Sequence, residues 1–182
     1  MNTADNRKII FIGGIHGVGK TTLCRKISEA LLIKHYSASE LISKLKVQTI
    51  SKDKKVSNIG ENQDILLESI NSFVHEKGYY LLDGHFCLLN SDGHITEISF
   101  DTYKSLELKE IIVLVDNEAK ICERLANRDK KQYSINLIKE FQEKEIHYAK
   151  EVAKRMDIRC KIINATDEQE EMFSFVKSIL DE

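Results

Sequence analysis

One short segment near the start of the chain has the residue types and spacing to bind a phosphate chain. Gly14-Ile15-His16-Gly17-Val18-Gly19-Lys20-Thr21 matches the pattern G-x-x-x-x-G-K-[ST] at every fixed position. The glycines let consecutive N–H groups point into one concavity, and a following helix adds its positive dipole end. We therefore expect Lys20 to reach the β- and γ-phosphates of a nucleotide and the Thr21 hydroxyl to bind Mg²⁺.

The flanking residues supply the elements that this loop needs. Residues 8–12 form a short apolar run that predicts a strand, and Leu23, Ile27 and Leu31 recur at helical spacing after the loop. His16 lies inside the loop, where it either contacts a phosphate or is simply exposed; exposure is the simpler interpretation. A complete phosphate-binding loop (P-loop) between a strand and a helix is the most specific feature of the sequence.

A second acidic group is expected at Asp83. It follows the apolar residues 79–82. Enzymes with a P-loop place a carboxylate at this position to hold Mg²⁺ or to orient the acceptor. The alternative is a turn or helix cap, but Gly84 follows at once and the loop needs a partner. His85 comes next and either faces the same cleft or is structural.

Two arginines complete the predicted catalytic set of Lys20, Asp83, Arg124 and Arg128. Arg124 and Arg128 are four residues apart, so they share one face of a helix. Guanidinium groups can stabilise the charge that spreads over a transferred phosphoryl group. The alternative is a solvated helix face, which would contribute little.

Length and composition predict one soluble globular domain spanning residues 1–182. The chain has 182 residues, 42% hydrophobic and 31% charged, with a net charge of −2. This balance argues against a general nucleic-acid binder, and no apolar run approaches the roughly 20 residues of a membrane span. Residues 1–6 are too polar for a secretory signal, so we expect a cytoplasmic protein.

The four cysteines are Cys24, Cys87, Cys122 and Cys160. They are widely separated and none forms a C-x-x-C pair, which argues against a zinc site. We expect free, mostly structural thiols in a reducing compartment.

Strand-like runs alternate with helical patterns along the whole chain. Strands are predicted at 32–36, 79–83, 111–115 and 161–163, and a hairpin at 86–98 turning at 90–93. Helices are predicted at 39–47, 60–77 with Gly78 as C-terminal cap, 118–128, 134–156 and 168–180, and a loop at 46–59. This alternation predicts an α/β fold with a parallel sheet covered on both faces. The P-loop, Asp83 and Asn164 should then meet at the carboxyl ends of the strands.

These motifs together resemble the P-loop nucleoside monophosphate kinases, particularly archaeal-type adenylate kinases and their bacterial relatives. The resemblance rests on residues 12–22, on Leu82-Asp83-Gly84-His85 and on residues 123–129, in an order and spacing that cover nearly the whole chain. It implies a three-layer α/β/α fold with five parallel strands in the order 2-3-1-4-5. It also implies an acceptor-binding region at residues 37–77 and a short lid at about 128–134.

The same resemblance implies ligands for particular residues. Ser37, Ser39 and Glu40 would open the acceptor region, Gln63 would lie near the acceptor base, and Thr166 would line the adenine edge. The implied ATP-binding residues are Gly14, His16, Gly17, Val18, Gly19, Lys20, Thr21, Thr22, Arg124, Asn164 and Ala165. The implied acceptor-binding residues are Ser37, Ser39, Glu40, Gln63 and His85, and the implied ligands of Mg²⁺ are Thr21 and Asp83.

The sequence departs from that family on the acceptor side. The lid holds Lys130 and Lys131 where such kinases usually have further arginines, and no arginine occurs between Arg25 and Arg124. Lysines in this stretch could substitute, but a point charge is a poorer bidentate clamp for a phosphate.

The leading hypothesis is therefore a kinase that uses ATP and Mg²⁺ to phosphorylate a small acceptor, most simply a nucleotide as in adenylate kinase. A kinase of a nucleoside or another small metabolite is the close alternative, favoured by the missing arginines. A regulatory ATP-binding protein or slow ATPase acting through a partner is the second class. A GTPase is disfavoured because residues 164–167 lack the lysine of N-K-x-D, and only the lysines at 44–55 favour a nucleic-acid end kinase.

Overall fold

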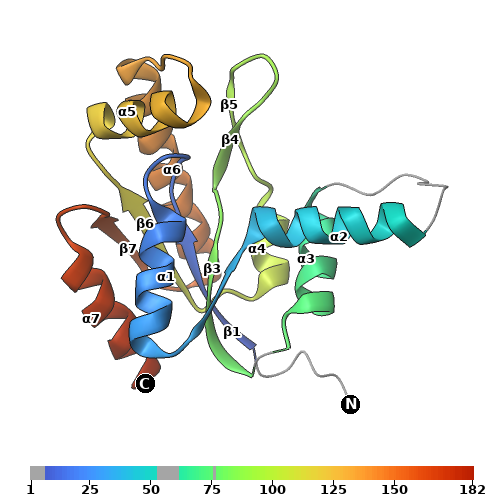
Figure 1. Ribbon diagram of the computed structural model, residues 1–182. Coiled ribbons are helices and arrows are strands. Elements are labelled where there is room, and N and C mark those ends of the chain that lie inside the picture. The colour runs from blue at the N-terminus through green and yellow to red at the C-terminus, as the bar shows by residue number, and fades with distance from the viewer. Residues whose placement is uncertain (1–6, 53–61, 76) are drawn as a thin grey trace.

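A five-stranded parallel sheet with helices on both faces organises the computed structural model (Figure 1). The structure describes residues 7–52, 62–75 and 77–182, without the side chains of residues 49–52 and 62–64. The sheet order is β2 (Lys34–Ser37), β3 (Gly78–Asp83), β1 (Arg7–Gly13), β6 (Glu110–Val115) and β7 (Cys160–Asn164). Counted within this sheet, the order is 2-3-1-4-5, so the expected α/β fold and strand order are confirmed.

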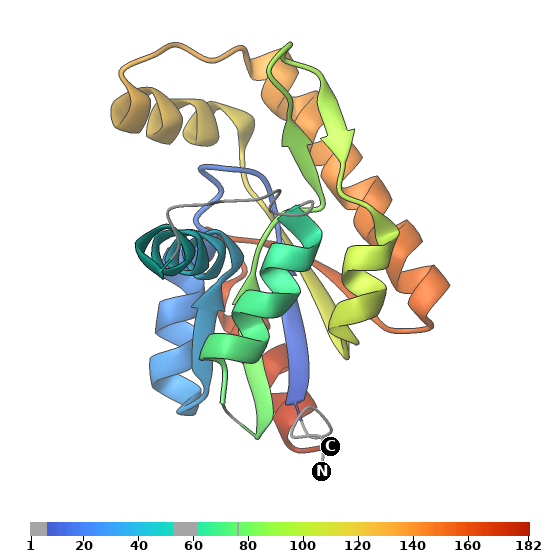
Figure 2. The same ribbon diagram turned by 90° about the vertical axis from the view of Figure 1, so that its right-hand side faces the viewer.

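The two layers around the sheet consist of helices that lie far apart in the sequence. Helices α1 (Lys20–Leu31) and α7 (Gln169–Leu180) cover one face, whereas α3 (Asn62–Phe73), α4 (Phe100–Leu106) and α6 (Ile135–Met156) cover the other (Figure 2). Helix α2 (Ala38–Lys52) packs on α3, and α5 (Glu118–Asp129) packs on α6. None of the helices in the described part of the chain has the length and apolarity needed to cross a membrane.

Burial of the central strands explains their near-continuous apolar sequences. Ile10, Ile12, Leu81 and Leu82 are completely buried, as are residues 111–113 of β6. A parallel strand covered on both faces needs apolar side chains in both directions. Complete burial of each such side chain contributes about 1.5–3 kcal/mol, so these strands form a rigid base for the loops at their carboxyl ends.

Two predicted boundaries in the acceptor region were wrong. Helix α2 continues to Lys52, whereas a loop was predicted from residue 46; the rest of that predicted loop, residues 53–59, lies outside the described residues. Lysine is a good helix former, so a lysine-rich segment can be the solvated face of a helix. Helix α3 ends at Phe73, so Gly78 does not cap it; Gly78 instead starts β3 with a φ of 93°.

The hairpin was predicted correctly, but the helix that follows it was not predicted. Strands β4 (Cys87–Leu89) and β5 (Ile95–Glu97) pair antiparallel, and the hairpin packs along α6. Helix α4 then begins after Ser99, whose hydroxyl accepts a hydrogen bond from Asp101 N. The buried residues Thr102, Tyr103 and Leu106 have helical spacing. A helix of only seven residues is too short for this periodicity to stand out in the sequence.

An aromatic cluster supports the loop that follows Asp83. The Phe86 ring stacks on Tyr103, and both rings meet Phe11 edge to face. A Cβ atom at Gly84 would lie 2.7 Å from the Phe11 ring, so only glycine fits between Asp83 and this cluster. The Asp83 loop is therefore held in place by the core itself.

Candidate active site

The P-loop links β1 to α1 at the carboxyl edge of the sheet. Gly19 is the N-cap of α1 with a φ of 102°, a left-handed conformation that favours glycine. Gly14 has a φ of 141°, and a Cβ atom there would lie 2.7 Å from the Leu114 carbonyl oxygen. These glycines let the loop turn tightly onto the helix N-terminus, an arrangement that binds phosphate through backbone N–H groups.

Lys20 lies over this loop. Its ammonium donates hydrogen bonds to the carbonyl oxygens of Gly14 at 2.6 Å and Ile15 at 3.0 Å, which leaves one N–H for a further acceptor. Burial lowers the pKa of Lys20 from 10.5 to about 8, although Glu145 and Asp83 raise it. A partly desolvated cation at a helix N-terminus is suited to bind the negative charge of a phosphate.

Glu145 on α6 is a residue that the sequence reasoning missed. It is 1% exposed, and its carboxylate accepts hydrogen bonds from Gly14 N at 2.8 Å, Phe86 N at 2.9 Å and Cys87 N at 2.7 Å. Burial raises the pKa of Glu145 although these N–H groups lower it. An acidic residue on the apolar stripe of α6, three residues before Tyr148, was the available signal. Glu145 ties the P-loop to the loop after β3.

Asp83 lies at the end of β3, beside the start of α1. It is 4% exposed; its Oδ2 accepts a hydrogen bond from the Thr21 hydroxyl at 3.4 Å and one from Nε2 of His35 at 2.6 Å. A hydroxyl and a carboxylate side by side are the oxygen donors that Mg²⁺ prefers, so the pair predicted as its ligands fits this ion. His35, on β2, was not predicted as part of the site.

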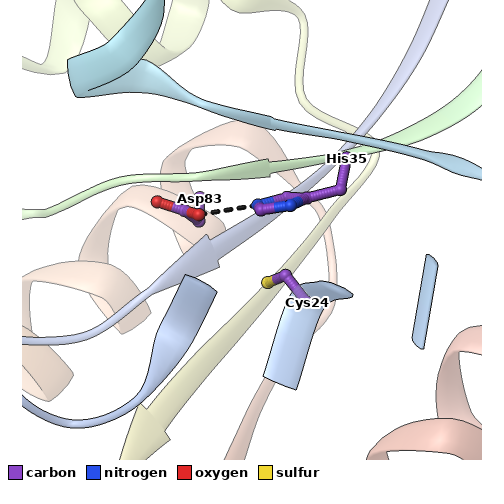
Figure 3. Close-up of side chains that lie close together, drawn as sticks. All are labelled: Cys24, His35 and Asp83. Atoms are coloured by element: carbon purple, nitrogen blue, oxygen red, sulfur yellow. Dashed lines mark hydrogen bonds and ion pairs between the residues drawn. The ribbon is translucent and has the colours of Figure 1, made fainter. Parts of the chain in front are cut away.

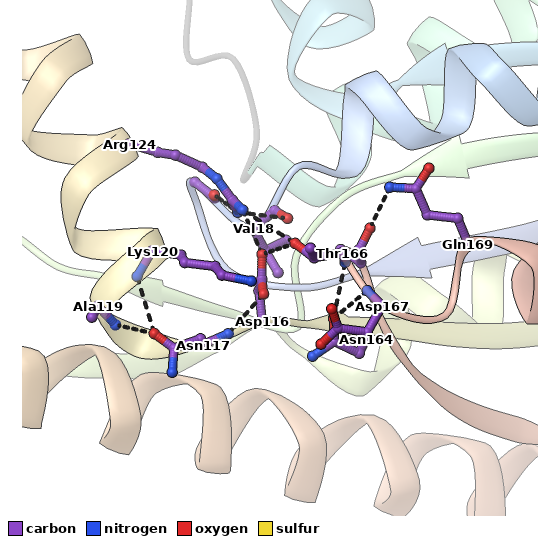
Figure 4. Close-up of polar contacts among 12 residues, drawn as sticks. Val18, Asp116, Asn117, Ala119, Lys120, Arg124, Asn164, Thr166, Asp167 and Gln169 are labelled. Carbon is purple, nitrogen blue, oxygen red and sulfur yellow. Dashed lines mark hydrogen bonds and ion pairs between the residues drawn. The ribbon is translucent and has the colours of Figure 1, made fainter.

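Arg124 is held at the other end of the P-loop (Figure 4). Its guanidinium donates to Asp116 Oδ2 at 2.5 Å, to the Gly17 carbonyl oxygen at 3.2 Å and more weakly to Val18 and Thr166. Thr166 also donates to Asp116 Oδ2 at 2.7 Å. Burial raises the pKa of Asp116, but the hydrogen bonds from Thr166 and Arg124 hold it below its usual value. Arg124 therefore fastens α5 to the back of the P-loop.

Arg128 has a different environment, although it lies on the same helix. It pairs with its neighbour Asp129 through Nε at 2.5 Å and Nη2 at 2.8 Å, and Asp129 also accepts from the Tyr133 hydroxyl. The Arg128 side chain is 57% exposed, at the end of α5 where the predicted lid begins. The two arginines therefore have different partners in this structure: Arg124 contacts the P-loop, and Arg128 pairs with Asp129 at the end of α5.

Two cavities open on either side of the P-loop. One, of about 230 Å³, is lined by Val18, Gly19, Thr22, Leu23, Lys26, Arg124, Ala165, Thr166 and Gln169. The other, of about 660 Å³, lies between the P-loop, Asp83, α2, the hairpin and α4, and its walls are largely apolar. The smaller cavity meets the expected adenine side and the larger the expected acceptor side.

The residues predicted for the nucleotide side are only partly brought together at the smaller cavity. Five of the eleven line it, namely Val18, Gly19, Thr22, Arg124 and Ala165, whereas His16 lines the larger cavity. Asn164 instead forms a turn, because its Oδ1 accepts hydrogen bonds from the backbone N–H groups of residues 166 and 167. Asn164 therefore shapes the loop that carries the cavity wall.

The residues predicted for the acceptor side are only partly brought together. Ser39 and His85 line the larger cavity, with His16 of the P-loop. The ring centres of His16 and His85 lie 4.1 Å apart, and burial lowers the pKa of His16 to about 4 and that of His85 well below its usual value. The remaining predicted residues lie elsewhere: Ser37 is buried beside Ser39, Glu40 is exposed away from the cavity walls, and the Gln63 side chain lies outside the described residues.

The chain is similar to a known protein family in its sequence and to solved kinase structures in its fold. A family model described as an AAA domain matches residues 13–142. No curated protein sequence matches the chain significantly. Among solved structures, a gluconokinase from Sinorhizobium meliloti 1021 aligns with a TM-score of 0.53 at 14% identity, over 96% of this chain and 94% of its own. A shikimate kinase from Bacteroides thetaiotaomicron aligns with a TM-score of 0.54 at 13% identity, over 96% and 99%. At such identities these two structures show a shared fold.

Proposed function

The chain belongs to the AAA domain family and has the fold of P-loop kinases, and from this premise we propose that it is an ATP-dependent kinase of a small metabolite. The observation that carries the proposal is the position of the P-loop between two cavities, with Lys20 and Asp83 beside it. Two cavities that share one wall suit a phosphoryl donor and a phosphoryl acceptor, because their reacting groups must come into contact. Two of the solved structures it resembles are, by name, a gluconokinase and a shikimate kinase.

In the proposed reaction, an acceptor hydroxyl oxygen attacks the γ-phosphorus of ATP, and the bond between that phosphorus and the β–γ bridging oxygen breaks to release ADP. Backbone N–H groups of the P-loop and the Lys20 ammonium stabilise the negative charge on the phosphates. Asp83, on the wall of the acceptor cavity, orients the hydroxyl and takes up its proton. Mg²⁺, held by Thr21 and Asp83, would neutralise further phosphate charge.

Arg124 and Arg128 have separate roles in this proposal. Arg124, paired with Asp116, positions α5 against the P-loop and the adenine cavity. Arg128 is exposed at the start of the residues 128–134 that we propose as a lid, so it can reach the phosphates only when the lid closes. Closure would also exclude water from the transferred group.

The acceptor cavity favours an uncharged hydroxyl compound. Its walls carry Lys46 together with the carboxylates of Asp83 and Glu97, and no arginine occurs in the sequence from 26 to 123. Two buried polar atoms on these walls, His85 Nδ1 and Thr102 Oγ1, have no hydrogen-bond partner among the described residues. Neutral donors and acceptors left unpaired on a cavity wall suit hydroxyl groups of a ligand. We therefore rank a nucleoside or another neutral metabolite above a nucleotide as acceptor.

A screen of acceptors with MgATP tests this function. We expect ADP release that depends on a neutral hydroxyl compound, and a loss of at least about 100-fold in Lys20→Ala and Asp83→Asn, since each change removes a transition-state contact. His85→Ala should raise KM for the acceptor, whereas His94→Ala, an exposed histidine of the hairpin, serves as the matched control. Best activity with a nucleoside monophosphate would instead favour the adenylate kinase-like alternative. ADP release that ignores every acceptor would favour a regulatory ATPase.

A further inference from the structure

Three potential metal ligands from three different elements converge beneath the P-loop (Figure 3). They are Cys24 of α1, His35 of β2 and Asp83 of β3, and one ligand atom from each lies within 4.8 Å of the other two. Strands β2 and β3 pair with Ser37 opposite Asp83, so His35 and Asp83 project from the same face of the sheet, and α1 covers that face. The sheet register and one helix therefore bring the three side chains together.

All three groups are shielded from solvent. Cys24 is completely buried, and the side chains of His35 and Asp83 are 9% and 6% exposed. The interaction between His35 Nε2 and Asp83 Oδ2, at 2.6 Å, satisfies only those two atoms and leaves the sulfur beside them. A preformed thiol, imidazole and carboxylate in a dry site is a ligand set that proteins use for zinc.

We propose that Cys24, His35 and Asp83 form a binding site for a thiophilic divalent cation, with Zn²⁺ as the expected ion. Three protein ligands leave a fourth position for water or for the Thr21 hydroxyl, 3.4 Å from Asp83 Oδ2. The sequence does not reveal this site through a C-x-x-C motif, because the three ligands are far apart in the chain. The separations are 11 residues from 24 to 35 and 48 residues from 35 to 83.

The ligand chemistry separates this site from the proposed Mg²⁺ site. Magnesium takes oxygen ligands, whereas thiolate sulfur selects soft or borderline ions such as zinc. Burial raises the pKa of the Cys24 thiol, so the ion must bind sulfur strongly enough to displace the thiol proton. We therefore expect Zn²⁺, Co²⁺ and Cd²⁺ to bind here, and Mg²⁺ and Ca²⁺ not to bind.

Zinc binding would draw the three ligand atoms closer together. Zinc bonds of about 2.0–2.3 Å in a tetrahedron place the ligand atoms roughly 3.3–3.6 Å apart. The cluster would contract around the ion, while the His35–Asp83 hydrogen bond opens to admit it. Asp83 lies on the wall of the 660 Å³ cavity, which gives the ion a path from solvent.

Binding there would regulate the proposed kinase, and this consequence, unlike the metal site itself, rests on that proposed function. Asp83 cannot serve a zinc ion and also hold Mg²⁺ or receive the acceptor proton. Zinc should therefore inhibit competitively with respect to Mg²⁺. The binding measurement below needs no catalysis, so failure of the kinase proposal and failure of the metal site are distinguishable.

Titration of the purified full chain with Co²⁺ tests the site directly. Cobalt bound to a thiolate gives a near-ultraviolet charge-transfer band, and we expect this band to saturate at one equivalent and to vanish on addition of Zn²⁺. Cys24→Ser, which keeps the side-chain volume, should remove the band and weaken zinc binding by at least about 100-fold, because even outer-shell partners contribute 10–100-fold. His35→Gln should weaken zinc binding similarly.

Control variants test whether other thiols of the chain bind the ion. Cys122→Ala and Cys160→Ala change the two partly exposed thiols and should leave the band intact. If Cys24→Ser does not fold, X-ray absorption of the zinc-loaded Cys122→Ala/Cys160→Ala protein replaces it, with sulfur and imidazole expected in the first shell. No charge-transfer band in the wild type, a band unchanged in folded Cys24→Ser, or a zinc shell without sulfur would each overturn the proposal.

Discussion

Lys20 is a buried cation whose charge the surrounding protein only partly stabilises. Burial lowers its pKa to about 8, so above that pH the folded protein holds Lys20 largely neutral, whereas the unfolded chain keeps it charged up to about 10.5. Between these values the unfolded state binds more protons, so the contribution of Lys20 makes stability rise with pH in that window. A phosphate bound beside the ammonium would reverse the balance, because it favours the charged form.

ATP binding should therefore take up a proton in alkaline solution. At about pH 9 we expect uptake approaching one proton per ATP, and an affinity that falls by up to about tenfold per pH unit above 8. Calorimetry of binding in buffers with different ionisation enthalpies measures the uptake. Lys20→Gln should abolish it, whereas Lys139→Gln, an exposed lysine on α6, should not. Equal proton uptake in the wild type and in Lys20→Gln would show that another group titrates.

The sequence predicted the site residues whose roles follow from a local motif. Lys20, Thr21 and Asp83 sit at fixed places in a loop or at a strand end, so their environment could be anticipated. His35, Asp116 and Glu145 were missed because each has a partner that is distant in the sequence, which for Asp116 is Thr166. Asp116 follows directly on the clearest predicted strand, so that strand end was the available signal. Arg128 was predicted at the site from its helical spacing with Arg124. That spacing does not reveal that Arg128 pairs with its neighbour Asp129.

At the scale of elements, helix α6 is more than a cover for the sheet. Through Glu145 it receives hydrogen bonds from the P-loop and from the loop after β3, and through Gln142 it pairs with the backbone of Asp116 at the end of β6. Because α6 follows the proposed lid directly, a shift of this helix would move three loops of the site together. This link exists only in the tertiary structure, whereas the strands and long helices follow from local periodicity.

Replacing Glu145 by glutamine tests this link. The amide NH₂ group would face a backbone N–H, so one buried donor loses its acceptor, which typically costs about 1–3 kcal/mol of unfolding free energy. ATP affinity should fall as well, because a neutral amide oxygen holds the Gly14 N–H group less strongly than the carboxylate does. Denaturant unfolding and nucleotide titration measure the two effects. The control is Glu143→Gln, an exposed position on the same helix, which should change the unfolding free energy by less than about 0.5 kcal/mol. If Glu145→Gln is as stable as this control and binds ATP as well, Glu145 does not link α6 to the P-loop.

At the scale of the whole molecule, the two cavities share the P-loop as a wall. His16 lines the larger cavity, proposed for the acceptor, whereas Val18 and Gly19 line the smaller one, proposed for the nucleotide. A ligand on either side therefore orders the same segment, and the lid and acceptor region can close over both. The central strands are buried along most of their length, so we expect closure to move α2, α5 and the hairpin around a sheet that stays fixed.

Nucleotide binding to such a fold should stabilise the entire chain. A ligand at 100 times its Kd adds about 2.7 kcal/mol to the unfolding free energy, which corresponds to a rise of about 5–10 °C in Tm for a domain of this size. We expect this shift with Mg²⁺ and a non-hydrolysable ATP analogue, and a further rise when the correct acceptor is added, because the second ligand binds a segment already ordered by the first. Lys20→Ala should lose most of the analogue's shift. A guanosine analogue that produces a larger shift than the adenosine analogue would contradict an adenine site beside Arg124 and Ala165, and it would reopen the choice of phosphoryl donor.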